Sequence, residues 1–193
     1  MARLKGIAMI YQIKIALDGI RPPIWRRVQV PAEMTLAELH EVIQLAMGWE
    51  DCHLHEFQIG HDRYGVPMDD DFGSDLDADE AKVQLDDVVR REKAKFRYTY
   101  DFGDNWRHTL TVEKILEAEP GVAYPVCLTG KRACPPEDCG GPWGYESLLE
   151  AKKHPKDPRC AELLEWAGPF DPEAFDLDAV NARLQPPRRP PCP

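Results

Sequence analysis

Apolar and polar residues alternate along two early stretches of the chain, a pattern that predicts β-strands with one buried face. Residues 9–17 place Tyr11, Ile13, Ile15 and Leu17 opposite Gln12, Lys14 and Ala16. Residues 24–30 place Ile24, Val28 and Val30 opposite Trp25 and Arg27. Because only a short turn at Asp18-Gly19 joins them, we expect the two strands to be antiparallel neighbours.

The period then changes to that of a helix. Thr35 and Glu38 have the spacing of a capping box, in which each side chain satisfies a backbone amide of the other residue. Apolar residues follow at helical spacing, and Gly48 is a typical C-terminal stop. They are Leu36, Leu39, Ile43, Ala46 and Met47. We expect this helix to cover one face of the sheet.

Alternation returns in a third strand over residues 53–59 and in a hairpin over residues 96–115. In the hairpin, Phe96, Tyr98, Tyr100 and Phe102 alternate with Arg97, Thr99 and Asp101. Gly103-Asp104-Asn105 forms the predicted turn. After it, the sequence predicts that Trp106, His108, Leu110, Val112 and Lys114 share one side.

This order of elements predicts an α+β fold with a mixed, largely antiparallel sheet and one main packed helix, opening in a β-grasp-like ββαβ arrangement. Beyond Glu117, frequent Pro and Gly indicate irregular structure with short helices at 145–153, 160–166 and 177–184. We expect one domain over residues 1–184, with its core at 9–117 and C-terminal loops and helices at 118–184. We expect residues 185–193 to form a proline-rich flexible tail.

Charge is distributed unevenly over the 193 residues. The net charge of −10 argues against general affinity for nucleic acid. Residues 62–80 are strongly acidic and have few apolar anchors, which predicts a solvated loop. A calcium loop is the alternative, but Asp69 to Gly73 lacks its ligand spacing. Basic residues cluster at 21–27 and 90–97, which leaves room for a local basic face.

The chain has no apolar stretch near the ~20 residues of a membrane span. Its six cysteines come without an export signal, which predicts a reducing, cytoplasmic location.

Metal-ligating and acid–base residues gather in three stretches of sequence. The hairpin tip carries Asp101, Asp104 and His108, and His53 and His55 project to one side of their strand. The third stretch runs from Cys127 through Cys134 and Cys139 and contains Glu137 and Asp138.

These residues are candidates for a divalent metal such as zinc, with His53, His55, His108, Cys127, Cys134 and Cys139 as ligands. The catalytic candidates are Asp101, Asp104, His108, Glu137 and Asp138. Turn geometry, packed histidines, loop-closing acids and buried thiols explain the same residues without a ligand. Both explanations remain open.

Several of these motifs resemble the plasmid pRiA4b ORF-3-like proteins, also found as transposon passenger (TnpR-like) proteins. The matching stretches are 23–27, 36–49, 53–57, 98–108, 134–145 and 170–181. The resemblance covers about residues 10–184 and implies an α+β fold and an association with mobile elements in bacterial or archaeal cytoplasm. It implies no established reaction, and the recombinase activity suggested by the TnpR label lacks an assured nucleophilic serine here.

Two functions follow. The first is a non-catalytic binding module for a protein or nucleic-acid partner, with Trp25, Arg26, Arg27, Trp106 and Arg107 as contacts of a type enriched in binding hot spots. The alternative is a metal-dependent hydrolase or nuclease. A site of this kind requires residues 53–55, 101–108 and 134–141 to meet in one recess. The partner, the substrate and the oligomeric state are left open.

Overall fold

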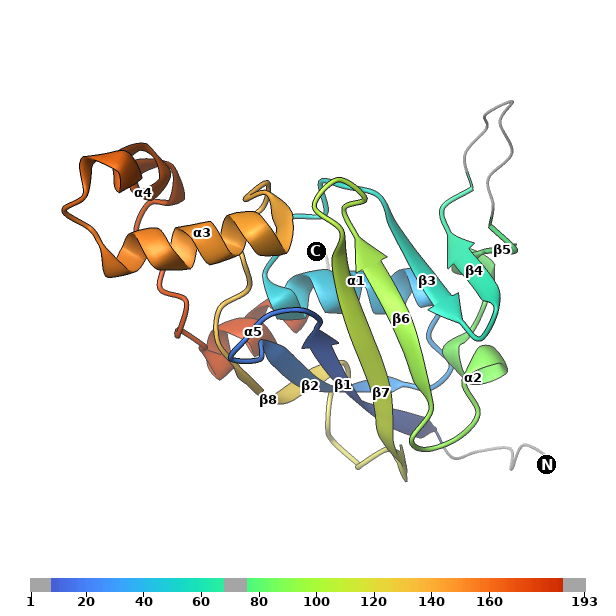
Figure 1. The fold of residues 1–193 in the computed structure, drawn as a ribbon. Helices are drawn as coiled ribbons and strands as arrows, with labels where there is room; N and C mark the ends of the chain where they lie inside the picture. The colour runs from blue at the N-terminus through green and yellow to red at the C-terminus, as the bar shows by residue number, and fades with distance from the viewer. Residues whose placement is uncertain (1–7, 68–75, 186–193) are drawn as a thin grey trace, which may run out of the picture.

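The computed structural model describes residues 8–67 and 76–185. It is a mixed α+β structure built on an eight-stranded sheet in the order β5-β4-β3-β6-β7-β1-β2-β8 (Figure 1). All neighbouring strands are antiparallel except β4 and β5. The predicted fold class is therefore confirmed.

The two opening strands form as predicted. β1 (Met9–Leu17) pairs along its length with β2 (Trp25–Pro31), and Ile13, Ile15, Val28 and Val30 are fully buried. The other neighbour of β1 is β7, so the predicted hairpin lies between β1 and β3.

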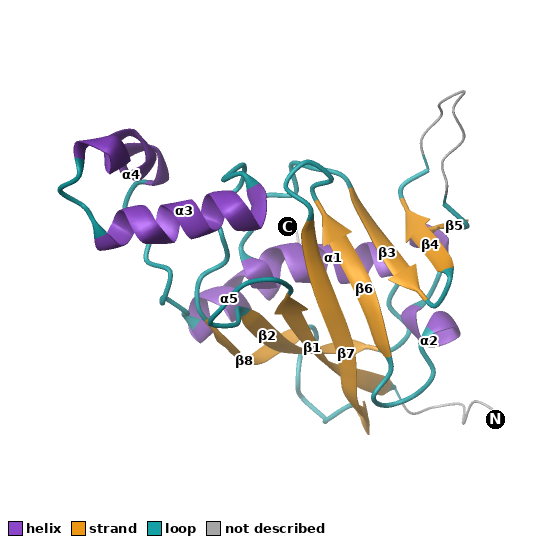
Figure 2. Cartoon of the chain, in the orientation of Figure 1, coloured by secondary structure: helices purple, strands orange, loops and turns teal. Residues whose placement is uncertain are grey.

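Helix α1 (Leu36–Met47) begins and ends where the sequence predicts. Thr35 and Glu38 form both hydrogen bonds of the capping box, and Gly48 adopts the left-handed conformation at the C-terminus. The helix buries Leu36, Leu39 and Ile43 completely. It lies behind the sheet in Figure 2, whereas the near face of the sheet carries no helix over β1, β6 and β7.

The predicted hairpin consists of β6 (Lys95–Tyr100) and β7 (Trp106–Glu117), and β3 (His55–Ile59) pairs with β6. Its loop is longer than expected, because Asp101 already leaves the strand with φ 55°. Phe102 was expected on the buried face, but it lies in this loop and is 51% exposed. The buried alternation on β7 is correct as far as Val112, after which the register with β1 shifts.

One strand was not predicted. β8 (Val126–Lys131) pairs with β2 in a segment where proline and glycine were expected to prevent regular structure. Within Val126–Lys131 only Gly130 is of that kind. The existing edge of β2 supplies the hydrogen bonds that the local sequence does not signal.

The C-terminal helices are α3 (Gly141–Lys153), α4 (Ala161–Ala167) and α5 (Leu177–Leu184). α3 begins four residues earlier than predicted, with Pro142 in its first turn. α5 is capped by the side chain of Asp176 and packs against α1 and β8. α3 and α4 extend away from the sheet on the left of Figure 1.

The acidic segment is only partly a loop. β4 (Asp62–Gly65) and β5 (Ala78–Asp79) pair with each other, a single turn (Glu80–Lys82) follows, and Glu80 is only 3% exposed. The calcium loop considered for residues 69–73 lies outside the described residues. A short helix, α2 (Leu85–Val88), precedes β6. None of the helices in the described part of the chain is long and apolar enough to cross a bilayer.

Candidate functional site

The hairpin tip is organised by Asp101. Its Oδ1 accepts hydrogen bonds from the amides of Gly103 (2.8 Å) and Asp104 (3.2 Å), which closes the loop as an Asx turn. Asp101 is 7% exposed. This use of Oδ1 leaves Oδ2 facing away from the turn.

The diproline loop lies directly against this tip. The amide of Gly140 donates to Oδ2 of Asp104 at 3.1 Å, and the indole nitrogen of Trp49 donates to the carbonyl of Pro135 at 3.0 Å. A Cβ added at Gly141 would lie 2.5 Å from the carbonyl oxygen of Asp104. Glycine at this position therefore permits the close approach of the loop to the hairpin.

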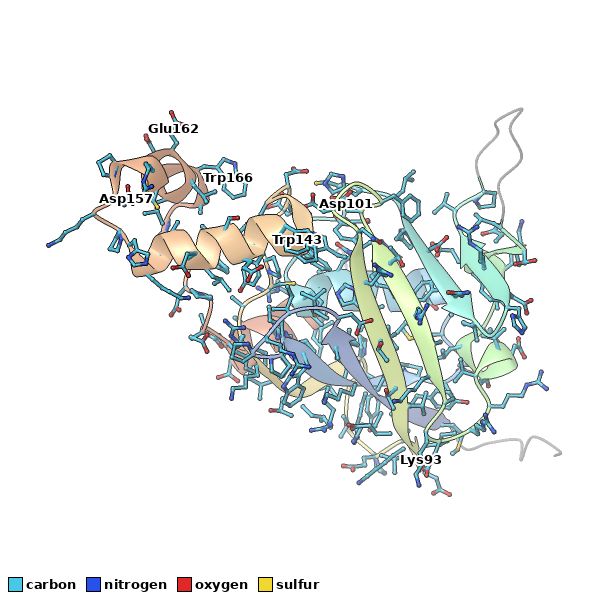
Figure 3. All side chains as sticks on the ribbon, in the orientation of Figure 1. Lys93, Asp101, Trp143, Asp157, Glu162 and Trp166 are labelled. Atoms are coloured by element: carbon cyan, nitrogen blue, oxygen red, sulfur yellow. The ribbon has the colours of Figure 1, made fainter. Side chains whose placement is uncertain are left out.

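His53 and three carboxylates meet where the loop and the tip join. Nε2 of His53 lies 3.2 Å from Asp138 Oδ1, 3.8 Å from Asp101 Oδ2 and 3.9 Å from Glu137 Oε2. We call His53, Asp101, Glu137 and Asp138 the tip cluster. Asp138 is largely exposed, so the cluster opens to solvent on that side. Figure 3 shows Asp101 at the end of the β6–β7 hairpin.

Neighbouring groups hold Glu137 in place. Its Oε1 accepts hydrogen bonds from the hydroxyl of Tyr100 (3.0 Å) and from the amide of Glu50 (2.9 Å). The Tyr100 hydroxyl in turn accepts from the amide of Cys52 at 3.0 Å. Burial, together with the adjacent Glu137, raises the pKa of Tyr100 well above its usual value, so it stays a neutral donor.

His55 belongs to a second, buried group rather than to the tip cluster. Its Nε2 lies 2.9 Å from both carboxylate oxygens of Glu80, and its ring stacks on that of His40 at 3.4 Å between centroids. Gln44 donates to the Tyr98 hydroxyl, which lies 2.7 Å from Nδ1 of His40.

The other nitrogen of His40 completes this group. The Tyr98 hydroxyl accepts a hydrogen bond from Gln44 and can therefore donate its own proton to Nδ1 of His40. The ring proton of His40 is then on Nε2, which donates to Asp51 at 2.8 Å. Burial, with the neighbouring His55, lowers the pKa of His40. We expect this group to be a satisfied hydrogen-bond network.

His108 does not reach the site. It is fully buried beside the rings of Trp49 and Tyr98, because even-numbered residues of β7 face the core up to Val112. Burial lowers its pKa to about 4. The prediction that His108 is a catalytic or metal-ligating residue at the tip is wrong for this reason. Asp104 also stands apart from the tip cluster and binds the backbone of Gly140.

The three candidate thiols do not assemble with histidine. Among the described residues, the groups spaced to hold a metal are His53, Asp101 and Asp138, and His40, Asp51 and His55; neither includes a cysteine. Cys127, Cys134 and Cys139 are buried, and burial raises the pKa of each thiol, that of Cys139 to about 12. These thiols are therefore protonated core residues.

The face of the sheet opposite α1 is basic. On β1 to β4, on β6 and on β7 up to residue 113, six basic side chains point outward: Lys14, Arg27, Arg63, Lys95, Arg97 and Arg107. Two acidic side chains, Glu56 and Glu113, share this face. We call this surface the open face. Glu56 pairs with Arg63 and Glu113 with Arg27. Lys14, Lys95, Arg97 and Arg107 form no ion pair within the described chain.

The predicted binding residues divide between the two faces. Arg27 and Arg107 point outward, as does Trp25, whose ring lies 5.1 Å from Lys14 Nζ and 5.3 Å from Arg27 Cζ. Trp106 is fully buried, so it is not available to a partner.

Arg26 is buried as well, because it alternates with Trp25 and Arg27. Its guanidinium donates to the carbonyls of Ala46, Trp25 and Lys131 and lies over the ring of Phe175. Arg26 therefore links α1 to the sheet and does not contact a partner.

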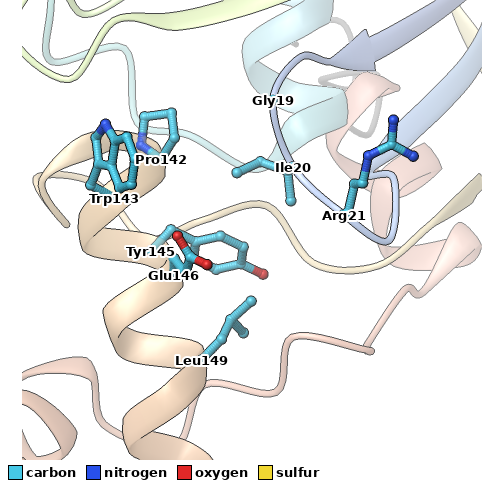
Figure 4. Close-up of a pocket in the computed structure, with 8 residues that line it drawn as sticks. All are labelled: Gly19, Ile20, Arg21, Pro142, Trp143, Tyr145, Glu146 and Leu149. Carbon is cyan, nitrogen blue, oxygen red and sulfur yellow. The ribbon is translucent and has the colours of Figure 1, made fainter.

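Two grooves border the open face near the hairpin tip. One, of about 460 Å³, is lined by Arg97, Asn105 and Arg107, by the acidic residues Asp18 and Asp104, and by residues 140–143. The other, of about 330 Å³, lies between residues 19–21 and the first turns of α3 (Figure 4). Trp143 lines both grooves and is 81% exposed.

Comparison with known proteins shows which family this chain belongs to. Residues 9–179 match the family described as plasmid pRiA4b ORF-3-like protein. The chain belongs to this family. Within the pRiA4b ORF-3-like proteins, it is 42% identical over 176 residues to the uncharacterised protein y4hQ of Sinorhizobium fredii, covering 91% of this chain and 88% of y4hQ.

A solved structure with the same fold is the protein of unknown function MM3350 from Methanosarcina mazei Go1. Its TM-score is 0.81 at 42% identity, with 90% of this chain and 98% of that chain covered. These similarities establish the pRiA4b ORF-3-like family and its fold. They assign neither an activity nor the transposon-passenger association.

Sequence reasoning missed Arg97 and Trp143 at the open face and its grooves, and His40 in the buried histidine group. In the sequence, Arg97 stands out only as part of a basic stretch. Its alternation with Phe96 and Tyr98 nevertheless places it on the same face as Arg107. Trp143 lies in a stretch that resembles the family, but the sequence alone indicates no binding role for it. His40 gave no signal, because it lies among the apolar residues of α1.

Proposed function

We propose that this protein is a cytoplasmic binding module whose open face holds a single strand of nucleic acid. The observation that carries the proposal is the group of four cations on that face, Lys14, Lys95, Arg97 and Arg107, for which the described residues supply no ion-pair partner. Arg97 and Arg107 lie diagonally across neighbouring strands, since Arg97 is opposite Thr109 and Arg107 is opposite Thr99. Like charges at this spacing repel unless an anion lies between them.

Aromatic side chains accompany the cations. Phe102 and Trp143 are exposed beside Arg97 and Arg107, and Trp25 is half-buried farther along the same face. Exposed rings provide stacking surfaces for bases, while arginines neutralise phosphates, and a flat sheet suits a single strand better than a duplex groove. A nucleic-acid ligand also agrees with the mobile-element association that the family resemblance implies.

The overall charge sets the strength of binding. A net charge of −10 repels a polyanion from the rest of the molecule, so we expect affinity that depends strongly on salt. Four phosphate contacts predict a slope of about −3 for the logarithm of the binding constant against the logarithm of salt concentration.

The test is fluorescence anisotropy with a labelled 20-nucleotide poly-dT or poly-U strand in about 50 mM salt. We expect Arg97→Ala with Arg107→Ala to weaken binding about tenfold or more and to reduce the slope by about 1.4. Trp143→Ala is expected to weaken it by at least fivefold through lost stacking. Arg159→Ala, on an exposed turn far from the open face, is the matched control.

The proposal fails if the wild type does not bind, or if the double variant binds as tightly as the wild type. A poly-glutamate chain of the same length that competes equally well would indicate an acidic protein partner instead of nucleic acid.

A further inference from the structure

The tip cluster contains metal-ligand atoms that the protein itself leaves unsatisfied. Nε2 of His53 and Oε2 of Glu137 are both buried as atoms and have no hydrogen-bond partner. The nearest contact of His53, 3.2 Å from Asp138, lacks the alignment of a hydrogen bond. Buried polar atoms without partners are costly and are rare in native proteins.

The two buried carboxylates share one arrangement. Asp101 uses Oδ1 to accept two backbone amides, and Glu137 uses Oε1 to accept the Tyr100 hydroxyl and the Glu50 amide. The second oxygen of each carboxylate faces His53. Fixing one oxygen in this way orients the other, which is how neighbouring groups position the ligands of metal sites.

The spacing fits one cation. Ligand atoms of His53, Asp101 and Asp138 all lie within 4.8 Å of one another. Bonds of about 2.0–2.2 Å to a shared ion require ligand atoms roughly 3–3.5 Å apart. Nε2 of His53 lies at this spacing from Asp138 (3.2 Å), and its distances to Asp101 (3.8 Å) and Glu137 (3.9 Å) are slightly longer. Glu137 stands outside the three-residue group, so it has to move toward the ion to become a fourth ligand.

We propose that His53, Asp101, Glu137 and Asp138 bind one divalent transition-metal cation. One imidazole with three carboxylates suits Zn²⁺ or Mn²⁺ and is less suited to Ca²⁺, which takes oxygen ligands. Exposed Asp138 leaves the ion accessible from solvent. The ligands come from the loops before β3, after β6 and before α3, so the ion ties three distant segments together.

The second histidine group makes a poorer site. His40, Asp51 and His55 also have metal-like spacing, but their rings are stacked in parallel and their nitrogens already have Tyr98, Asp51 and Glu80 as partners. None of the side-chain atoms of these three residues is buried without a hydrogen-bond partner. It provides a control group of two histidines and one aspartate in the same chain.

The test uses the full chain, stripped with a chelator and dialysed, and titrated separately with Mn²⁺ and Zn²⁺ by calorimetry. We expect one ion per chain and a thermal midpoint raised by about 5 °C or more at saturation. Asp138→Asn and His53→Gln are expected to weaken binding at least tenfold. Because the side chains of Asp138 and His53 form no hydrogen bond within the described part of the chain, we expect both variants to keep the fold.

Asp51→Asn is the matched control and is expected to bind like the wild type. The proposal is overturned if neither ion binds at 100-fold molar excess, if Asp138→Asn and His53→Gln bind like the wild type, or if Asp51→Asn abolishes binding. Co²⁺ substitution adds a spectroscopic readout: its visible absorption changes in His53→Gln if the imidazole is a ligand.

Discussion

The buried histidines of this chain differ in whether their nitrogens are satisfied. His40 and His55 have a partner for the nitrogens that face carboxylates, whereas Nε2 of His108 has none. Nδ1 of His108 lies 3.1 Å from the carbonyl of Trp106, which fits a neutral ring with its proton on Nδ1. A protonated His108 would place a positive charge in an apolar core.

This burial predicts a loss of stability in acid. The pKa of His108 is about 4 in the folded protein and 6.5 when unfolded, so the unfolded chain binds more protons between these values. Stability therefore falls as pH drops from 6.5 toward 4, by about 3 kcal/mol in total from this residue. In His108→Leu, we expect the decrease between pH 7 and pH 4.5 to be about 2 kcal/mol smaller, measured by urea unfolding.

The exposed His154 serves as the control for that experiment. Its replacement by alanine removes a histidine without removing a buried neutral ring, so the pH profile of stability is expected to match the wild type. An unchanged profile in His108→Leu would show that other groups cause the acid sensitivity.

Single residues also show how far sequence alone could locate the site. His53, Asp101, Glu137 and Asp138 were all named as candidates, because acids and histidines in turns are rare enough to be noticed. His108 and Arg26 were also named, although each follows the alternation of its strand into the core. Chemical type drew attention to them, whereas strand phase decides where they point.

At the scale of elements, β8 depends on a side chain from α5. Asn181 accepts from the amide of Cys127 at 2.8 Å and donates to its carbonyl at 3.0 Å, so one side chain pairs with the strand as a neighbouring strand would. This pairing is long-range and could not be predicted from the sequence around β8. It explains in part why a strand forms in a segment with weak strand signals.

Asn181→Ala removes both hydrogen bonds. We expect a loss of about 1–2 kcal/mol and faster hydrogen exchange at the amide of Cys127, measured by urea unfolding and by exchange mass spectrometry. Asp178→Asn, an exposed change on the same helix, is expected to leave both quantities unchanged. Equal protection of β8 in Asn181→Ala and the wild type would exclude this pairing as a source of its stability.

The start of α3 depends on a close contact with the preceding loop. A Cβ added at Gly144 would overlap the carbonyl oxygen of Cys139, which is backbone and cannot rotate away. Gly144→Ala is therefore expected to cost about 2–4 kcal/mol, again by urea unfolding. Ser147→Ala, farther along α3, is expected to change stability by no more than about 0.5 kcal/mol. A Gly144→Ala variant as stable as the wild type would rule out this steric constraint.

Elements with strong local signals were predicted well for a physical reason. These signals act within a few residues, so they can be recognised directly in the sequence. They are the capping box of Thr35 and Glu38, the apolar stripe of α1 and the alternation of β6. The bend at Asp101 and the early start of α3 at Gly141 depend on contacts between the hairpin tip and the diproline loop. Local patterns do not record such contacts.

At the scale of the whole molecule, α3 and α4 project from the body formed by the sheet, α1 and α5 (Figure 1). α4 contains no buried residue, and Glu162 and Trp166 lie on its outside (Figure 3). The chain nevertheless returns to the body, because Val180 and Leu184 of α5 are buried and Arg183 donates to the carbonyl of Leu45. The projection is held at both ends.

Limited proteolysis tests this arrangement. We expect trypsin to cut early after Lys156 or Arg159, which are exposed, and not after Arg26, which is buried. The two fragments are expected to co-elute in gel filtration and to separate only in denaturant, since α5 stays packed on α1 and β8. Separation without denaturant would contradict the packing of α5.

The two margins of the sheet have one more consequence. On one side the last strand is the two-residue β5, and on the other the side chain of Asn181 occupies backbone groups of Cys127 in β8. Within the described residues, both margins therefore offer fewer free amides and carbonyls to another chain than a long open strand would. We expect concentrated solutions of the folded protein to resist fibril growth by strand addition.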